Sequence, residues 1–237
     1  MKRNTAFFVV LIFSFLSYFY GLLTIQYQIF PFEVIRTTKN LITGNTNKVS
    51  PRYLHKKSFF ETFGQKEYDI VFIGDSITDG AEWEDMFPKY KIANRGISGD
   101  TTSGILNRMD SILSTQASKA FIMVGINDFN RGDSVDTVFN NYKKIIEILK
   151  INGLKVYIQS TILGGNRVSG LNEKINSLNS KLKVLSEKNN LTYINLNNNL
   201  SENGLLSTAF TLDDVHLNGE GYKAWKASIK KYVVIID

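Results

Sequence analysis

Apolar and polar residues alternate along this chain in blocks of different length and period. Short continuous apolar runs such as Ile70–Ile73 are typical of strands buried on both faces. Stretches with apolar residues three and four positions apart separate these runs and predict amphipathic helices. The expected strands are residues 70–73, 89–93, 119–124, 156–160 and 191–196, and the expected helices are residues 101–113, 135–151, 171–188 and 219–234. This order of elements predicts an α/β fold with a parallel sheet covered on both faces.

The apolar stretch at the N-terminus is too long to be a strand. Ala6–Leu23 spans eighteen positions without a charge, and about 20 helical residues are needed to cross the core of a bilayer. A cleaved signal peptide would have a shorter apolar run ending in small residues, and Leu22–Ile25 offers no such site. The pattern therefore favours a transmembrane signal-anchor helix over residues 6–25. Lys2 and Arg3 then place residues 1–5 in the cytoplasm and the rest of the chain outside it.

Residues 31 to about 66 show no sustained hydrophobic period. The segment TTKNLITGNTNKVSPRYLHKKS is polar and rich in turn-forming residues. We expect a tether, or an arm that lies on the folded domain, over residues 26–65. The domain itself is expected over residues 66–237.

The net charge of +6 raises the question of nucleic-acid binding. Residues 1–60 hold eight of the 28 basic residues but one of the 22 acidic residues, so the expected domain is nearly neutral. A nucleic-acid-binding domain should carry the positive charge itself, and we therefore expect no nucleic-acid partner. The chain has no cysteine, which excludes a disulfide scaffold, thiolate zinc sites and a cysteine nucleophile.

Polar motifs follow the expected strands. Asp75 and Ser76 come directly after the first strand, and the motifs NRGISGD (94–100), GINDF (125–129) and DDVHLNGEGY (213–222) come later. The carboxyl ends of parallel strands meet at one edge of the sheet, where ligands bind in such folds. Ser76 at this edge could be a nucleophile, although Ser and Asp are also common N-caps of helices.

The two histidines, His55 and His216, decide where a base for Ser76 could come from. Only His216 lies within the expected domain, and a serine needs a neighbouring base to act as a nucleophile. Asp213 precedes His216 by three residues, a spacing that can bring a carboxylate to the imidazole and orient it. Asp214 is a competing partner for the imidazole.

Two further residues admit both a structural and a functional interpretation. Asn127 and Gly99 could serve tight turns, or they could supply N–H donors to an oxyanion together with the Ser76 N–H. The acidic stretch DSITDGAEWED offers oxygen atoms to a metal ion from Asp75, Asp79, Glu82, Glu84 and Asp85. Their spacing fits no known calcium loop, so we interpret the stretch as an exposed acidic turn and expect no metal site.

The four motifs, in this order, resemble those of the SGNH hydrolases, also called GDSL esterases or lipases. GDS (74–76), GISGD (96–100), GIND (125–128) and DDVH (213–216) are similar to the four family blocks, and the likeness extends from Asp69 to about Tyr232. The resemblance implies a flavodoxin-like three-layer α/β/α fold and no cofactor. It also implies that Ser76 is the nucleophile, His216 the general base and Asp213 the acid that orients it, with Ser76, Gly99 and Asn127 as the oxyanion hole.

The resemblance leaves the substrate open. The expected function is a serine esterase that acts through an acyl-enzyme on a small acyl ester, an acetylated glycan or a lysophospholipid of the cell envelope. An O-acyltransferase would use the same residues and pass the acyl group to a sugar hydroxyl. A membrane-tethered carbohydrate-binding module without catalytic activity is the alternative from another class, and such a module would be free to lose Ser76 or His216.

Overall fold

The computed structural model describes residues 12–23, 50–64 and 67–234. The chain divides into two compact units, residues 1–49 and residues 50–237. In the first unit, residues 12–23 form a helix with mostly exposed side chains. The membrane span expected over residues 6–25 lies partly outside the described residues, as does the expected tether from residue 26 to residue 49. Across the described ranges, no helix combines the length and the apolar character that crossing a membrane requires.

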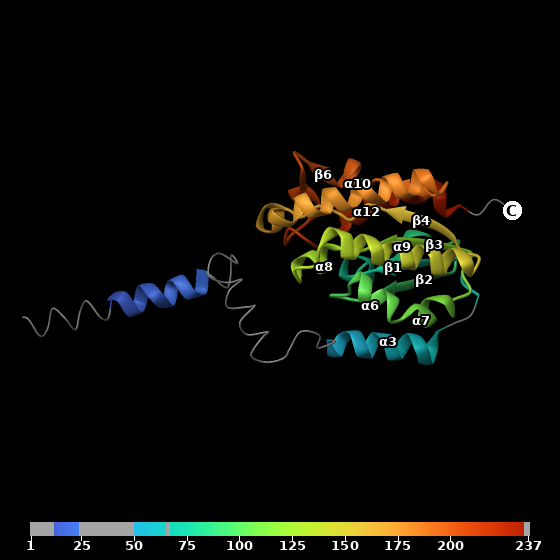
Figure 1. Ribbon diagram of the computed structural model, residues 1–237, viewed down its shortest axis with the longest axis horizontal. Helices are drawn as coiled ribbons and strands as arrows, with labels where there is room; N and C mark the ends of the chain where they lie inside the picture. The colour runs from blue at the N-terminus through green and yellow to red at the C-terminus, as the bar shows by residue number, and fades with distance from the viewer. Residues whose placement is uncertain (1–11, 24–49, 65–66, 235–237) are drawn as a thin grey trace, which may run out of the picture. The chain divides into compact units, whose positions relative to one another are not determined.

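A five-stranded parallel sheet forms the centre of the second unit (Figure 1). The strands are β1 (Ile70–Gly74), β2 (Ile92–Gly96), β3 (Lys119–Met123), β4 (Lys155–Gln159) and β5 (Thr192–Ile194). Their spatial order is β2-β1-β3-β4-β5. This is the flavodoxin-like order, in which successive strands are added first on one side of β1 and then, from β3 onward, on the other side.

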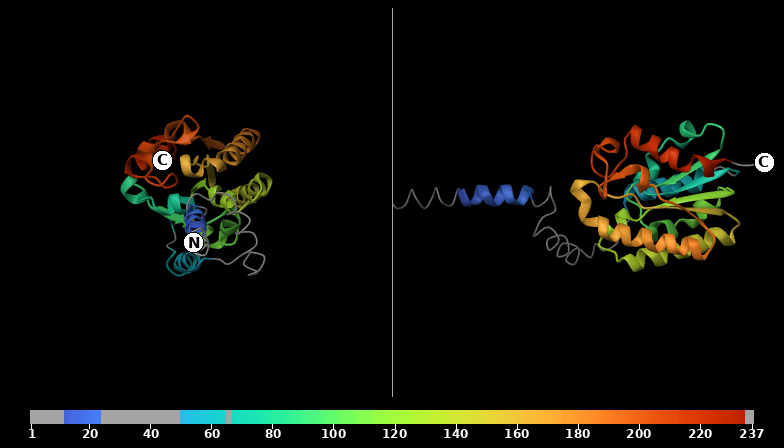
Figure 2. Two further views of the ribbon diagram at one scale, coloured as in Figure 1. Left: turned by 90° about the vertical axis from the view of Figure 1, so that its left-hand side faces the viewer. Right: turned by 90° about the horizontal axis from the view of Figure 1, so that it is seen from above.

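Helices cover both faces of this sheet (Figure 2). One face packs against α6 (Thr102–Leu106), α7 (Met109–Leu113), α9 (Val135–Ile151) and α10 (Asn172–Lys188). The other packs against α5 (Trp83–Met86), α11 (Asn197–Leu200) and α12 (Gly219–Val233). Because successive side chains of a strand point to opposite faces, Val71 and Ile73 of β1 belong to the first layer, whereas Ile70 and Phe72 belong to the second. The predicted three-layer α/β/α arrangement is therefore confirmed.

The second layer is rich in stacked aromatic rings. The ring of Phe72 lies between Trp83, at a centroid distance of 3.6 Å, and Phe121, at 4.9 Å. Phe121 in turn stacks on Tyr157 at 4.5 Å. Large buried rings of this kind contribute strongly to core stability, and this stack fixes three neighbouring strands, β1, β3 and β4, against one another.

Helix α3 (Pro51–Phe63) lies on this unit where no regular structure was expected. Ser50 is its N-cap and accepts a hydrogen bond of 3.1 Å from the Tyr53 N–H, and Pro51 occupies the first helical position. Only Tyr53 and Phe60 are buried, so the inward face is too narrow to produce a visible hydrophobic period. The short elements that remain are β6 (Ser201–Glu202), β7 (Leu205–Leu206), η1 (Asn166–Leu171) and η2 (Thr208–Phe210).

Two other sequence predictions differ from the structure in detail. The helix expected over residues 101–113 is two short helices, α6 and α7, with a break at Asn107 and Arg108. The second strand begins at Ile92 and not at residue 89. It lies at the edge of the sheet, and its polar residues Asn94 and Arg95 hide it from a search for apolar runs.

Candidate active site

Ser76 is the first residue of α4 (Ser76–Asp79), which follows β1 after a single residue. That residue, Asp75, is the N-cap, and its Oδ1 accepts a hydrogen bond of 3.0 Å from the Ile77 N–H. The capping role considered for Ser76 therefore belongs to Asp75. The Ser76 hydroxyl is left for a partner outside the helix.

His216 is that partner. Ser76 Oγ lies 2.9 Å from His216 Nε2, and His216 Nδ1 lies 2.6 Å from Asp213 Oδ2. Residues 140 positions apart in the chain thus meet at the carboxyl end of β1. A hydroxyl, an imidazole and a carboxylate in this sequence of contacts are what a serine nucleophile requires.

The Asp213 carboxylate is held by its own loop. Its Oδ1 accepts hydrogen bonds from the N–H groups of Val215, at 3.0 Å, and His216, at 2.7 Å. Burial acts to raise the pKa of Asp213, but the hydrogen bonds from the His216 ring and from these N–H groups outweigh burial and lower the pKa to about 2. Asp213 is consequently ionised at neutral pH and can stabilise a positively charged imidazole ring.

Asp214, the competing partner for His216, points elsewhere. Its Oδ2 accepts hydrogen bonds of 3.1 Å from both the Nε and the backbone N–H of Arg167. Asp214 has a left-handed backbone, with φ at 68°, which few residues other than glycine adopt without strain. This turn directs its side chain to Arg167 in η1 and leaves Asp213 as the partner of His216.

The three expected oxyanion donors come from three segments. The Ser76 N–H begins α4 and has no acceptor within that helix. Gly99 has φ at 76° and open space where a Cβ would stand, so a substrate can approach its backbone closely. Asn127, in α8 (Ile126–Asn130), donates from Nδ2 to the Asp100 carbonyl oxygen over 3.0 Å, which leaves a second hydrogen on the same nitrogen.

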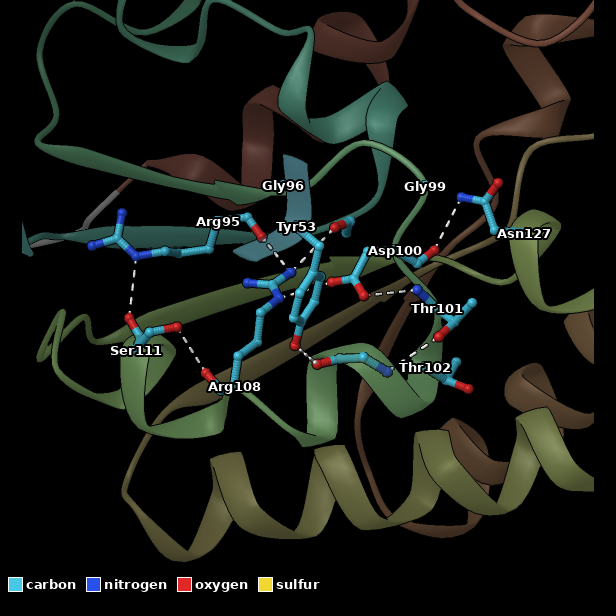
Figure 3. Close-up of polar contacts among 12 residues, drawn as sticks. Tyr53, Arg95, Gly96, Gly99, Asp100, Thr101, Thr102, Arg108, Ser111 and Asn127 are labelled. Carbon is cyan, nitrogen blue, oxygen red and sulfur yellow. Dashed lines mark hydrogen bonds and ion pairs between the residues drawn. The ribbon is translucent and has the colours of Figure 1, made fainter. Parts of the chain in front are cut away.

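The loop that carries Gly99 is tied to the strand that delivers the nucleophile. The Ile97 N–H donates to the Gly74 carbonyl oxygen over 3.2 Å. Asn127 reaches the same loop through Asp100, next to Gly99 (Figure 3). Of the predicted site residues, the structure thus joins Ser76, His216 and Asp213 directly, and Gly99 with Asn127 through Asp100.

A buried ion pair behind this loop was not anticipated from the sequence. Arg108 Nε lies 2.8 Å from Asp100 Oδ2, and neither side chain is more than 1% exposed. Arg108 Nη2 also donates to the carbonyl oxygens of Arg95, at 2.8 Å, and Gly74, at 3.3 Å. The one feature of the sequence that could have indicated this ion pair is Arg108 itself, a charged residue within a largely apolar helical stretch.

Three buried carboxyl groups, those of Asp75, Asp100 and Asp128, lie near the site, and none of them is hydrogen-bonded to Ser76 or His216. Burial raises the pKa of Asp75 to about 7, although the hydrogen bond from Ile77 opposes this effect. Burial also raises the pKa of Asp128 to about 6 against the hydrogen bonds from Thr102. Burial raises the pKa of Asp100 as well, and Arg108 counteracts it. Asp128 holds the start of α6 through a 3.0 Å hydrogen bond from the Thr102 N–H.

The acidic stretch after β1 does not form one exposed turn. Glu82, Glu84 and Asp85 are exposed, but Asp75 is fully buried, and Asp79 is paired with two cations of α3. Within the residues that the structure describes, no group of three or more His, Cys, Asp or Glu side chains could hold a metal ion.

Comparison with known proteins points to one family. Residues 72–224 match the sequence profile of the GDSL-like lipase/acylhydrolase family. The solved structure of a GDSL-like lipase from Bacteroides thetaiotaomicron superposes with a TM-score of 0.67 at 26% identity, covering 76% of this chain and 96% of that one.

Two curated relatives are similar in sequence. The N-acylneuraminate cytidylyltransferase of Streptococcus agalactiae serotype V is 24% identical over 192 residues, which cover 81% of this chain. This chain spans 44% of the length of that relative. The platelet-activating factor acetylhydrolase IB subunit alpha2 of Rattus norvegicus is 25% identical over 165 residues, which cover 66% of this chain and 72% of the relative.

Proposed function

The chain belongs to the GDSL-like lipase/acylhydrolase family, and from this premise we propose that it is a carboxylic ester hydrolase in which Ser76 attacks the ester and forms an acyl-enzyme intermediate. The observation that carries the proposal is the contact series from Ser76 Oγ to His216 Nε2 to Asp213, with distances of 2.9 Å and 2.6 Å. In this arrangement His216 can deprotonate the serine while Asp213 orients the imidazole.

The first half of the reaction transfers the acyl group to the enzyme. His216 Nε2 accepts the Ser76 hydroxyl proton while Ser76 Oγ bonds to the ester carbonyl carbon. The negative charge on the carbonyl oxygen is stabilised by N–H donors of Ser76, Gly99 and Asn127, and one such donor typically lowers a barrier by about 2.7–4 kcal/mol. The bond to the alcohol oxygen then breaks, and the alcohol leaves with the proton from His216.

The second half returns the enzyme to its starting state. His216 accepts a proton from a water molecule, and the hydroxide bonds to the acyl carbon of the ester on Ser76. The bond to Ser76 Oγ breaks, Ser76 regains its proton from His216, and a carboxylic acid is released. Asp213, ionised throughout, stabilises the imidazolium in both halves.

Exposure of the catalytic side chains supports hydrolysis over acyl transfer. The His216 side chain is 50% exposed and that of Asp213 is 48% exposed. Water can therefore reach the imidazole that would activate it, whereas acyl transfer to a sugar requires that water be kept out. An open site also admits an ester whose alcohol part belongs to a large molecule.

For the substrate we propose a short acyl ester, with acetyl favoured, on an envelope glycan or a lysophospholipid. The likeness to an acetylhydrolase subunit supports the acetyl group, and the open site supports a bulky alcohol. We further propose that the apolar segment Ala6–Leu23 holds the enzyme on a membrane with its catalytic unit outside the cytoplasm, because Lys2 and Arg3 precede that segment.

Two experiments test the proposal. A series of p-nitrophenyl esters from acetate to decanoate tests the substrate class, and labelling by a fluorophosphonate tests the mechanism. The full-length wild type in detergent should hydrolyse the acetate with the highest kcat/KM and lose activity as the acyl chain grows.

A fluorophosphonate should label Ser76 in the wild type and leave the Ser76→Ala variant unlabelled. Ser180→Ala, on the exposed surface of α10, is the matched control. Labelling of a serine other than Ser76 would contradict the mechanism, and a preference for long chains would contradict the substrate class.

A further inference from the structure

Helix α3 contacts four segments that lie beside the candidate catalytic groups. The family profile begins at residue 72, so α3 precedes the part of the chain that the profile describes. Its side chains nevertheless reach the loop of Gly99, α6, the helix of Ser76 and the end of β2.

The first contact is with the loop of Gly99. Tyr53 and Phe60 of α3 form a small separate core with Ile97, which is fully buried. Ile97 lies two residues before Gly99, and its N–H is bonded to the Gly74 carbonyl oxygen over 3.2 Å. The packing of α3 therefore acts directly on the segment that carries one oxyanion donor.

The second contact is with α6, beside the buried Asp100–Arg108 ion pair. The Tyr53 hydroxyl donates to the Gly104 carbonyl oxygen over 2.8 Å, and the tyrosine lies beside Arg108 and Asp100 (Figure 3). Burial, followed by the nearby Asp100 carboxylate, raises the pKa of Tyr53. The hydroxyl consequently stays protonated and keeps its donor role at neutral pH.

The third contact is with the helix that begins at Ser76. Arg52 Nη2 lies 3.0 Å from Asp79 Oδ2, and Lys56 Nζ lies 2.8 Å from Asp79 Oδ1. The Asp79 side chain is only 6% exposed, whereas those of Arg52 and Lys56 are 62% and 37% exposed, so two cations at the surface hold one sheltered carboxylate. Asp79 is the last residue of α4, one turn after the nucleophile.

A fourth contact reaches β2. The ring of Phe60 lies 4.5 Å from the Arg95 guanidinium carbon, a typical cation–π distance. The Arg95 carbonyl oxygen is also the acceptor for Arg108 Nη2 at 2.8 Å. The same helix therefore supports the ion pair that joins the Gly99 loop to the ends of β1 and β2.

We propose that α3 is a strap that sets the position of the Gly99 loop relative to Ser76, with Tyr53 and Asp79 as positioning residues. The proposal rests on the esterase function proposed above, since it assigns α3 a part in that reaction. Its consequence is that Pro51–Phe63, which lies within the segment expected from the sequence to be a tether or arm, contributes to turnover.

Two substitutions in the full-length protein separate positioning from simple stabilisation. Tyr53→Phe removes one hydroxyl and keeps the ring, and Asp79→Asn removes both ion pairs and keeps the shape. A typical hydrogen bond lost at a positioning site corresponds to a fall in kcat of about threefold to tenfold, and we expect this at 25 °C per folded molecule with little change in KM. Lys57→Gln, which removes the Lys57–Glu61 pair on the same helix, is the matched control and should leave kcat unchanged.

Hydrogen exchange measured by mass spectrometry gives a readout that does not depend on activity. Amides in residues 97–104 should exchange faster in Tyr53→Phe and Asp79→Asn than in the wild type, and Lys57→Gln should leave them unchanged. If both kcat per folded molecule and exchange in this loop match the wild type, the proposal is wrong. If the wild type hydrolyses no ester, the proposed function is wrong. Hydrogen exchange then still tests the strap, because unchanged exchange of residues 97–104 in Tyr53→Phe and Asp79→Asn would contradict it.

Discussion

Asp213 and Asp214 are neighbours in sequence, yet the structure gives them different partners. Asp213 accepts hydrogen bonds from the His216 ring and from the backbone of its own loop, whereas Asp214 binds Arg167. The sequence could narrow the partner of His216 to these two residues but could not choose between them. The choice depends on the left-handed backbone of Asp214, which no local pattern in the chain indicates.

This difference predicts unequal effects of removing the two carboxylates. Asp213→Ala should lower kcat by about 10⁴-fold, because the imidazole loses the group that orients it and stabilises its charge. Asp214→Ala should cost about fivefold or less, since Asp214 does not contact His216 and its ion-pair partner Arg167 is 58% exposed. Steady-state kinetics on p-nitrophenyl acetate measures both. Equal losses in the two variants would contradict the assignment of Asp213.

Asp75 predicts how the stability of the protein changes with pH. Its pKa is raised from 3.8 to about 7 by burial, so between these values the folded state binds a proton that the unfolded state releases. The free energy of unfolding should therefore fall as pH rises from about 4 to about 7, by at most about 1.4 kcal/mol per pH unit. Above pH 7 this contribution should be constant.

Asp75→Asn keeps the cap acceptor and removes the titration. Urea unfolding at pH 4.5, 6 and 7.5 should show the variant gaining stability relative to the wild type as pH rises. Asp110→Asn, at an exposed site on α7, is the control and should show no such trend. A relative stability of Asp75→Asn that is constant over this range would refute the buried, protonated state of Asp75.

At the scale of elements, the sequence predicts those strands and helices whose hydrophobic pattern and capping residues are local in the chain. The strands β1, β3 and β4 appear as continuous apolar runs because both of their faces are buried. The expected helix over residues 135–151 has the bounds of α9, since Ser134 caps it and Gly153 follows it. Helix α3 could not be predicted, because only Tyr53 and Phe60 are buried and their partner Ile97 is distant in sequence. The residues of the Asp100–Arg108 pair are eight positions apart, but no local pattern indicates that both side chains are buried.

The approach of α4 to β2 predicts a strong effect at one glycine. A Cβ at Gly96 would stand 2.2 Å from the Asp79 nitrogen and 2.6 Å from its Cα. These are backbone atoms that cannot turn aside, so Gly96→Ala should destabilise the fold by about 1–3 kcal/mol or more and lower kcat by displacing α4. Gly170→Ala, where nothing lies within 4 Å, is the control. A Gly96→Ala variant with wild-type Tm and kcat would contradict this packing.

At the scale of the whole molecule, a neutral catalytic unit follows a basic and apolar N-terminal segment. Because Lys2 and Arg3 precede Ala6–Leu23, we expect a C-terminal alkaline phosphatase fusion to be active and a C-terminal green fluorescent protein fusion to be dark. The reverse pattern would place the catalytic unit in the cytoplasm. Protein sequencing of the mature N-terminus completes the test, since a start beyond residue 20 would indicate cleavage in place of anchoring.

The central claim is that Ser76 and His216 act as one unit in ester hydrolysis, and a double-mutant comparison of kcat on p-nitrophenyl acetate tests it most directly. Ser76→Ala and His216→Ala should each remove about 10⁶-fold of turnover, because neither group functions without the other. The double variant should be scarcely slower than either single variant. Wild-type turnover in a pure preparation of Ser76→Ala, or losses that multiply in the double variant, would contradict the claim.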